Sequence, residues 1–351
     1  MRRGGSRGLW CAVAAAGVLL SACGSTRAAV HPPRPARIGL TPRGRPAAAA
    51  AHARARPPAA SGARSRPSRL PEVIPAVAVV VENAPAARPQ SGLDHAALVW
   101  EMLAEGGITR FFCIFTQPAA RIGPVRSTRI YFDQLDRAYG LPFAHAGGNV
   151  DALAYVHTWH LQNIDEIYGA GPYFWRSASR AAPHNLYTST HLLEAAVHAF
   201  GYTSPGLILP PRGPLPAGAV PTASVSLHYA YNPPAYVYTA GWQWSGHSWI
   251  RTVNGQVQVM TDGRRVRAGT VIILVVPYGP DPDPHTPGSI RMLWNEPGPA
   301  WVLRDGQRFA ASWAMGSNGL PQVSAGGRPV PVGPGPYWFE VVPVASNVVF
   351  H

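Results

Sequence analysis

Lysine is missing from all 351 residues, and carboxylates are few, with seventeen Asp and Glu against thirty arginines. No acidic residue precedes Glu72, whereas thirteen of the arginines do, which leaves seventeen arginines for seventeen carboxylates in the rest. The formal charge of +13 therefore belongs to the N-terminal segment, and the body of the protein is formally neutral. Because the basic segment lacks interleaved aromatic residues, we expect no nucleic acid partner.

Sequence signatures of nucleotide, cofactor and metal sites are missing too. There is no phosphate-binding loop, no dinucleotide-binding fingerprint and no His-Glu-x-x-His pattern, and neither Ser91 nor Ser127 lies in a Gly-x-Ser-x-Gly elbow. We therefore predict no cofactor and no metal. His157 and His160 have the spacing of a ligand pair on one helix, but we interpret them as surface residues because no thiolate or further histidine pattern accompanies them.

The beginning of the chain has the form of an export signal. A basic stretch, MRRGGSRG, precedes the apolar run LWCAVAAAGVLL, which is shorter than the roughly 20 residues of a membrane span. The following residues, Leu20 to Cys23, resemble the lipobox of bacterial lipoproteins. The resemblance implies cleavage before Cys23 and acyl chains such as palmitate on that residue, anchoring the protein to the outer leaflet of the cytoplasmic membrane. The alternative is an ordinary signal peptide that carries a cysteine.

The rest of the chain divides by composition. The segment after Cys23 is built of Arg, Ala, Pro, Gly and Ser, and it has too few large apolar side chains to offset the entropy of ordering. Cys113 remains as a lone cysteine in an apolar run, and we interpret it as a core residue. The predicted segments are a signal peptide (1–22), a disordered polybasic tether (23–71), an α/β domain (72–205), a Pro/Gly-rich joint (206–222) and a β-rich domain (223–351).

Apolar runs and helical patterns alternate in the first half of the body. Strands are expected at 76–83, 109–115 and 141–148, and helices at 91–107, 127–140, 149–159 and 188–201. This alternation predicts an α/β unit with a largely parallel sheet. The second half has short β runs joined by Asn-Gly and Asp-Gly pairs at Asn254, Asp262 and Asp305, which predict antiparallel hairpins. Whether the two halves share a sheet stays open.

Several long motifs resemble a known family. IGPVRSTRIYF, HAGGN and RTVNGQVQVMTDG, together with most of the chain after Ile74, are similar to the YerB-like family of bacterial lipoproteins, a two-part domain of unknown function. The resemblance implies a secreted, lipid-anchored envelope protein with an α/β part and a β-rich part. It also implies work beside cell-wall synthesis, as an accessory to its enzymes, but no particular activity.

Polar residues follow the expected strands and open the expected helices. Ligands of open α/β sheets bind beyond the carboxyl ends of the strands, and helix N-termini and arginines both favour anions. We therefore predict an anion pocket at this edge, with a second group of polar residues beside it. The expected pocket residues are Arg110, Arg126, Ser127, Arg129, His145, Gly147, Gly148, Asn149, His184 and Asn185, and the second group is Glu82, Asn83, Glu101 and Glu105.

Two other interpretations of these residues remain open. The arginines can be neutralised internally, by Glu101 and Glu105 on the expected first helix or by Asp133 and Asp136 nearby. A histidine, His145 or His184, can act with Glu82 or Glu105 as acid and base on a wall polymer. No catalytic residue can be assigned from the sequence, and Ser127 fits a helix N-cap better than a nucleophile.

Aromatic residues crowd the start of the second half. Their alternation fits one buried face of a sheet, although exposed rings would offer a docking surface for a partner protein. The crowded rings are Tyr229, Tyr231, Tyr236, Tyr238, Trp242, Trp244 and Trp249. The function predicted is that of a lipid-anchored binding or accessory protein for an anionic wall component or a membrane protein of wall synthesis, with a wall hydrolase or a docking scaffold as alternatives.

Overall fold

The structure is a computed structural model that describes residues 75–207, 209, 212–229, 238–281 and 285–351. The predicted export signal, the lipidation site at Cys23 and the tether lie outside these residues, as do Tyr231 and Tyr236. None of the helices in the described ranges has the length and apolar character needed to span a membrane.

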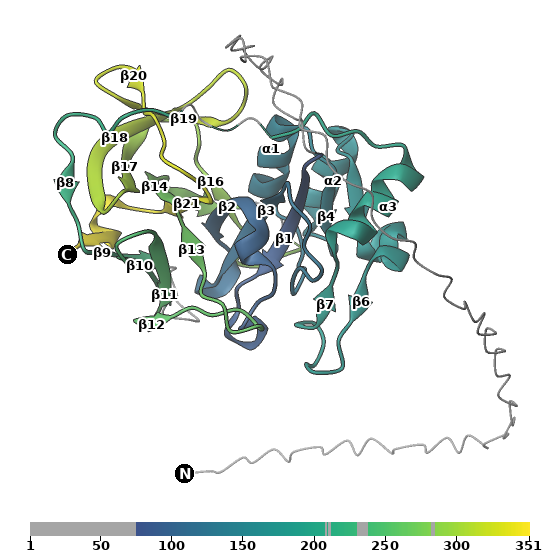
Figure 1. Ribbon diagram of the computed structural model, residues 1–351. Helices are drawn as coiled ribbons and strands as arrows, with labels where there is room; N and C mark the ends of the chain where they lie inside the picture. Colours follow the sequence, from purple (N-terminus) through teal and green to yellow (C-terminus); the bar gives the residue numbers. More distant parts are fainter. Residues whose placement is uncertain (1–74, 208, 210–211, 230–237, 282–284) are drawn as a thin grey trace, which may run out of the picture. The chain divides into compact units, whose positions relative to one another are not determined.

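One large mixed sheet contains strands from both halves of the chain (Figure 1). Its centre is formed by β21, a strand from the C-terminal end, which lies between β14 and β2 and runs parallel to both. The strands in spatial order are β20 (Arg328–Pro329), β19 (Pro321–Ala325), β18 (Gln307–Met315), β17 (Gly298–Arg304), β14 (Thr270–Val275), β21 (Tyr337–Val342), β2 (Ala96–Leu103), β3 (Thr109–Phe115), β1 (Val77–Glu82), β4 (Phe143–His145) and β5 (Asn163–Asp165), with β8 (Val220–Pro221) paired to β18.

A small antiparallel sheet and two hairpins complete the β structure. The small sheet contains β12 (Gln256–Val257), β11 (Trp249–Val253), β10 (Tyr238–Trp244), β9 (Ser224–Tyr229) and β22 (Val348–Phe350), with β13 (Arg267–Ala268) paired to β11. The hairpins are β6 (Trp175–Arg176) with β7 (Leu186–Tyr187), and β15 (Tyr278–Pro280) with β16 (Ile290–Met292). The α-helices are α1 (Ile130–Tyr139), α2 (Val150–Thr158) and α3 (Thr190–Phe200).

The fold is β-rich with a mixed sheet, so the predicted fold class is confirmed only in its coarser form. In the N-terminal half, β1–β4 and β4–β5 are parallel pairs, but β1–β3 and β2–β3 are antiparallel. The expectation of a largely parallel sheet depended on a helix between the first two strands. That helix does not exist.

The prediction of a helix over 91–107 is wrong, because its central part is β2. Leu93, Trp100 and Leu103 do have helical spacing, but they overlap an almost unbroken apolar run that is buried along nearly all of its length. Strands covered on both faces have this kind of sequence. Gly106 and Gly107, at φ 71° and 81°, form the tight turn into β3 instead of ending a helix.

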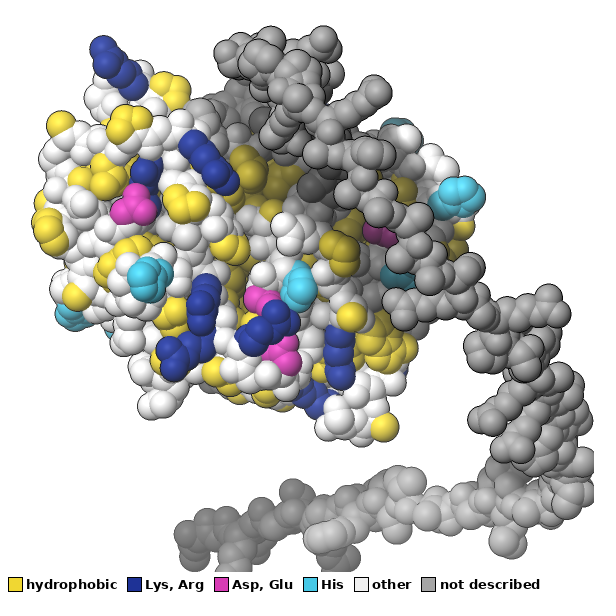
Figure 2. Space-filling model, viewed as in Figure 1, with side chains coloured by type: hydrophobic (Ala, Val, Ile, Leu, Met, Phe, Trp, Pro, Cys, Tyr) yellow, Lys and Arg dark blue, Asp and Glu magenta, His cyan; other side chains and the backbone are white. Residues whose placement is uncertain are grey.

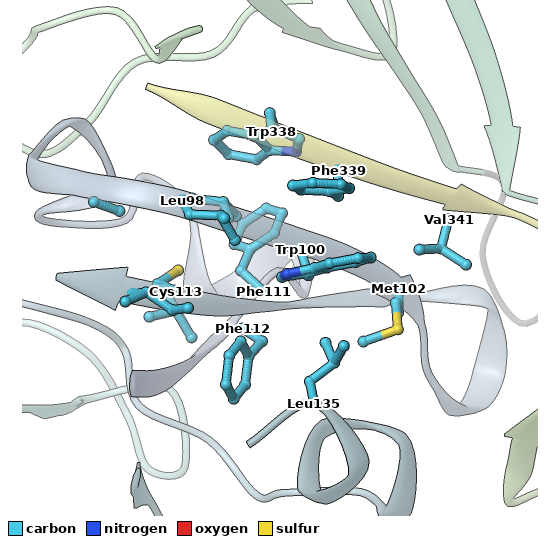
Figure 3. Packing of buried hydrophobic residues seen from close by; sticks show 14 of the residues in the cluster. Leu98, Trp100, Met102, Phe111, Phe112, Cys113, Leu135, Trp338, Phe339 and Val341 are labelled. Carbon is cyan, nitrogen blue, oxygen red and sulfur yellow. The ribbon is translucent and has the colours of Figure 1, made fainter. Parts of the chain in front are cut away.

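The core lies on both faces of β2, β3 and β21. On one face the rings of Trp100 and Phe339 stack with centroids 4.0 Å apart, and Leu135 of α1 closes the layer (Figure 3). On the other face Trp338 meets Trp242 of the small sheet edge-on at 5.1 Å. The large sheet therefore packs against a helix on one side and against the small sheet on the other.

Most other expected elements are present. The strands at 76–83, 109–115 and 141–148 correspond to β1, β3 and β4, and the remaining three helices to α1, α2 and α3. Helix α1 ends at Gly140 and α3 at Gly201, both in the left-handed conformation expected after a helix. The N-cap of α1 is Arg129, two residues later than the predicted Ser127.

Candidate functional site

Three strands of the large sheet end in polar residues on one edge. β1 ends at Glu82, β4 at His145 and β5 at Asp165, and these strands are parallel. Arg110 reaches the same edge because β3 is antiparallel to β1 and pairs it with Glu82. We use the name polar edge for this end of the strands, where β1, β4 and β5 finish, together with the loops next to it. The predicted gathering of polar residues is therefore present.

The connection over 116–129 reaches the polar edge by a different path from the expected one. β3 ends at Phe115, beside the first residue of β1 and therefore at the opposite end of the strands from the polar edge. The chain then runs back along β1. The Arg126 amide donates a hydrogen bond to the Val80 carbonyl (3.0 Å) on this return. Arg126 consequently lies beside Glu82 even though the strand direction was predicted incorrectly.

Glu105 binds two of the predicted pocket arginines. Arg129 donates from Nε and Nη2 to its two carboxylate oxygens, and Arg110 Nη2 lies 3.5 Å from Oε2. Arg110 Nη1 also donates to the Ser127 carbonyl (3.1 Å). Burial and the neighbouring charge of Arg129 lower the pKa of Arg110 to about 10. These two buried guanidinium groups therefore share one internal carboxylate, Glu105, which is one of the internal partners that the alternative interpretation expected.

Glu82 is shared by two partly exposed side chains, those of Arg126 and His184. His184 Nδ1 lies 2.9 Å from its Oε2, and Arg126 Nε lies 3.2 Å from its Oε1. The Glu82 side chain is only 2% exposed, whereas those of Arg126 and His184 are 28% and 27% exposed. A buried carboxylate thus holds an arginine and a histidine at the surface of the polar edge.

Asp165 occupies the place predicted for an external anion. The backbone N–H groups of Gly147 and Ile167 both donate to its Oδ1, at 2.8 and 3.0 Å. His145 is fully buried beside it and directs Nδ1 to the Gly147 carbonyl (3.0 Å). Burial lowers the pKa of His145, against the opposing charge of Asp165. The sequence interpretation missed Asp165, whose signal was a short polar-ended strand like β1 and β4.

The glycines and Asn149 have packing roles at this edge. The Thr128 amide donates to the Gly147 carbonyl (2.9 Å), so the two expected pocket loops pair with each other. A Cβ on Gly148 would lie only 3.0 Å from Thr128 Cγ2, so this glycine permits the close approach of the loops. Asn149 points elsewhere, with Nδ2 3.4 Å from Asp281 Oδ2 of the C-terminal half.

Asn185 holds the loop of the β6–β7 hairpin. Its Nδ2 donates to the carbonyls of Ser177 and Arg180, both at 3.1 Å, and its Oδ1 accepts from Arg176 (3.2 Å). Since its amide is engaged in these bonds, Asn185 supports the loop that carries His184 instead of facing a ligand.

Glu101 and Asn83 belong to a separate buried network between the two sheets. Arg251 of β11 donates to Glu101 from Nη2 and to Glu340 of β21 from Nη1. Asn83 Nδ2 donates to Glu101 (3.3 Å) and to the Tyr238 hydroxyl (2.8 Å). Arg251 and Glu340 were not predicted; their signal was a charged residue at an inward-facing position of an otherwise apolar strand.

The aromatic residues of the second half face this interior. Tyr229, Tyr238, Trp242 and Trp249 are all at most 3% exposed. Tyr229 and Trp242 donate hydrogen bonds to Glu340, at 2.6 and 2.7 Å. The predicted burial is confirmed for these four rings, which are therefore not available as a docking surface.

The remaining candidates do not form a site with the polar edge. Asp133 accepts a hydrogen bond from Thr128, and neither carboxylate oxygen of Asp136 has a hydrogen-bond partner. Burial raises the pKa of both aspartates. In the described part of the chain, no group of three or more His, Cys, Asp or Glu side chains is placed to hold a metal ion.

Arginines outnumber carboxylates around the polar edge. Its strands and adjoining loops carry Arg88, Arg110, Arg121, Arg126, Arg129, Arg176 and Arg180 against Glu82, Glu105, Asp165 and Glu166. Arg121 stacks on the Tyr187 ring and Arg180 donates to backbone carbonyls, so neither guanidinium is neutralised there. Figure 2 shows basic and acidic side chains side by side on one face of the molecule. The edge thus keeps an excess of positive charge after its internal pairs are counted.

Comparison with known proteins assigns the chain to a family. The models for "Protein of unknown function (DUF3048)" match with the N-terminal domain over residues 61–203 and the C-terminal domain over residues 225–339. The chain therefore belongs to this two-part family.

The chain is similar in sequence to "Putative lipoprotein YerB" of Bacillus subtilis (strain 168). It is 42% identical over 127 residues, which are 36% of this chain and 38% of that protein. The crystal structure of the YerB protein from Bacillus subtilis is similar with a TM-score of 0.72 at 27% identity, covering 81% of this chain and 96% of the other. The chain thus shares the YerB fold, and the printed name of the relative is that of a putative lipoprotein.

Proposed function

We propose that the protein is a lipid-anchored, extracytoplasmic binding protein that holds an anionic group of a cell-wall component at the polar edge. The observation that carries this proposal is the sharing of buried Glu82 by Arg126 and His184, both about a quarter exposed. Both side chains are partly exposed, so their nitrogen atoms can also donate to an external anion beside Glu82. The excess of neighbouring arginines strengthens the attraction of such an anion.

Arg126 is the residue to test. The purified full chain is titrated calorimetrically with inorganic phosphate, with muropeptides and with an anionic wall polymer at low and high salt. We expect binding that weakens with salt and is lost in Arg126→Ala. Arg328→Ala is the matched control, because Arg328 is exposed on β20 at the far end of the large sheet. Equal binding by Arg126→Ala and the parent protein would refute the proposal.

A hydrolase is the second candidate, because His184 and Glu82 form a close imidazole–carboxylate pair. The same mixtures are analysed for products by mass spectrometry. Turnover that disappears in His184→Ala would favour this candidate. Binding without any product would favour the binding protein.

The anchor is tested separately at Cys23. Cells expressing the chain are labelled with a palmitate analogue and fractionated. We expect label and membrane association in the parent chain, and loss of both in Cys23→Ala. Label on the Cys23→Ala chain would exclude this anchor.

A further inference from the structure

A pocket beside the C-terminal half of α1 shares no residue with the polar edge. It has a volume of about 520 Å³ and lies between α1, the residue that follows α2, the segment after β16 and the turn that joins β18 to β19. Sites for small molecules commonly have volumes of about 300 to 1,000 Å³. The space is therefore sufficient for a small ligand.

Arg137 brings a positive charge to this pocket without an internal counter-charge. Its side chain is exposed, and in the described part of the chain no carboxylate forms a salt bridge with it. Asp133 and Asp136 of the same helix are buried. The lining contains neither Asp nor Glu, and its other polar residues are uncharged. An anionic ligand would therefore not compete with a carboxylate of the protein.

Trp159 holds the guanidinium of Arg137 in place. Arg137 Cζ lies over the Trp159 ring, 4.6 Å from its centroid, and Tyr155 packs on the same tryptophan with ring centroids 4.3 Å apart. An aromatic face attracts a guanidinium without engaging its N–H groups as a carboxylate would. These N–H groups form a fork that matches the two oxygens of a carboxylate. The accessible guanidinium is thus oriented but not neutralised.

The opposite part of the lining is apolar. Trp294 meets Trp313 edge-on with ring centroids 5.8 Å apart. Trp313 is itself 1% exposed and donates to the Val275 carbonyl (2.8 Å), so Trp294 packs on a fixed support. Met315 also borders the pocket and is 39% exposed, and its unbranched thioether adapts to ligands of different shape. The pocket therefore offers an apolar surface together with one accessible cation.

We propose that this pocket binds a small organic acid with one carboxylate and an apolar body. The carboxylate pairs with Arg137, and the body packs against Trp294 and Met315. Because the lining has a single cation, it offsets one negative charge and favours a monocarboxylate over a polyanion. The carboxyl end of a peptide and a free aryl acid share this chemistry. The site does not depend on the function proposed for the polar edge.

The test uses the full chain in a non-ionic detergent and a buffer without carboxylates. N-acetyl-phenylalanine represents the carboxyl end of a peptide and phenylacetate represents a free acid. Both are titrated by calorimetry and saturation-transfer NMR, with N-acetyl-phenylalanine amide as the matched neutral compound. We expect binding of at least one acid, and the one that binds identifies the source of the carboxylate. The neutral amide should bind about tenfold more weakly than N-acetyl-phenylalanine if the peptide end is the ligand.

Arg137→Gln removes the charge at an exposed position, so the fold is retained. We expect it to bind the acid about tenfold more weakly, with Arg137→Lys between the two because it keeps the charge but not the fork. Trp294→Ala, verified by a thermal melt, should weaken binding through the lost apolar wall. The matched control is Arg308→Gln, since Arg308 also lies over an aromatic ring, that of Phe350, but does not line this pocket.

Three outcomes would overturn the proposal. The first is that neither acid binds. The second is equal binding of the acid by Arg137→Gln and the parent chain, which would place the ligand elsewhere, including at the polar edge. The third is displacement of the acid by an equal concentration of inorganic phosphate, because the apolar body would then contribute nothing.

Discussion

Glu101 and Glu340 lie opposite each other, in register, on the parallel strands β2 and β21. Two buried carboxylates in this position repel each other, and the structure offsets the repulsion with Arg251, which donates to both. Burial, together with the charge of Glu101, raises the pKa of Glu340 to about 8. A pKa above neutrality favours the protonated form of the Glu340 carboxyl at pH 7.

Removing the guanidinium should destabilise the fold strongly. Arg251→Met keeps much of the side-chain volume but removes the buried guanidinium that donates to both Glu101 and Glu340. We expect a loss of about 3–5 kcal/mol in the free energy of unfolding, measured by denaturant titration. Arg328→Met, at an exposed position, should leave the midpoint where it is. A midpoint shift of similar size in both variants would contradict a specific role for Arg251.

The proton on Glu340 makes stability depend on pH. Its pKa is raised in the folded state from a usual 4.5 to about 8, so its contribution is complete below about pH 4.5 and is lost as the pH rises to 8. Glu340→Gln removes this dependence. We expect the variant to lose less stability than the parent between about pH 5 and pH 8 in denaturation experiments. Parallel curves for the two proteins would show that Glu340 is already ionised.

Glu105 should give the opposite pH dependence of stability, because its pKa is lowered in the folded state. Burial opposes its ionisation, but the hydrogen bond from Arg129 and the charges of Arg110 and Arg129 hold its pKa below the usual 4.5. Its contribution is therefore present above about pH 4.5 and is lost as the pH falls further. We expect Glu105→Gln to be destabilised by a few kcal/mol at neutral pH, because two buried guanidinium groups lose their partner. The difference from the parent should shrink in acid; a constant difference would count against the ion pair.

Cys113 should be inert until the protein unfolds. It is 0% exposed, and burial raises the pKa of its thiol. Because the thiolate is the reactive form, a thiol reagent should leave Cys113 unmodified in the native protein and modify it completely in denaturant. Mass spectrometry of the peptide that contains Cys113 measures this directly. Fast modification of the native protein would show that β3 opens.

Local sequence patterns were sufficient where local interactions decide the structure. The glycines that end α1 and α3, and the turns at Asn254 and Asp305 with their positive φ values, were all predictable. β2 was not, because its apolar spacing fits a helix as well as a buried strand. The contact that allows Glu101 to occupy a strand interior is made by Arg251, 150 residues away.

In the candidate site, too, the sequence predicted the features that depend on local patterns and missed those that depend on distant contacts. The gathering of Glu82 and His145 at one edge follows from where the strands end, and the sequence predicted it. Arg110 joins them because β3 is antiparallel to β1, which the sequence did not predict. The internal pairing of Arg129 with Glu105 and of Gly147 with Asp165 depends on distances that no spacing reveals. A pattern of arginines and helix starts therefore predicts that anionic groups bind there. It does not show whether these groups are carboxylates of the protein itself or belong to a ligand.

The position of β21 has a consequence for biogenesis. This strand is among the last to leave a ribosome or an export channel, yet β2 and β14 both need it as their hydrogen-bonding neighbour. A chain that crosses a membrane from its N-terminus must wait, incompletely folded, until nearly all of it has emerged. Truncation before Tyr337 would remove the middle of the sheet and leave two unpaired strand edges prone to aggregation.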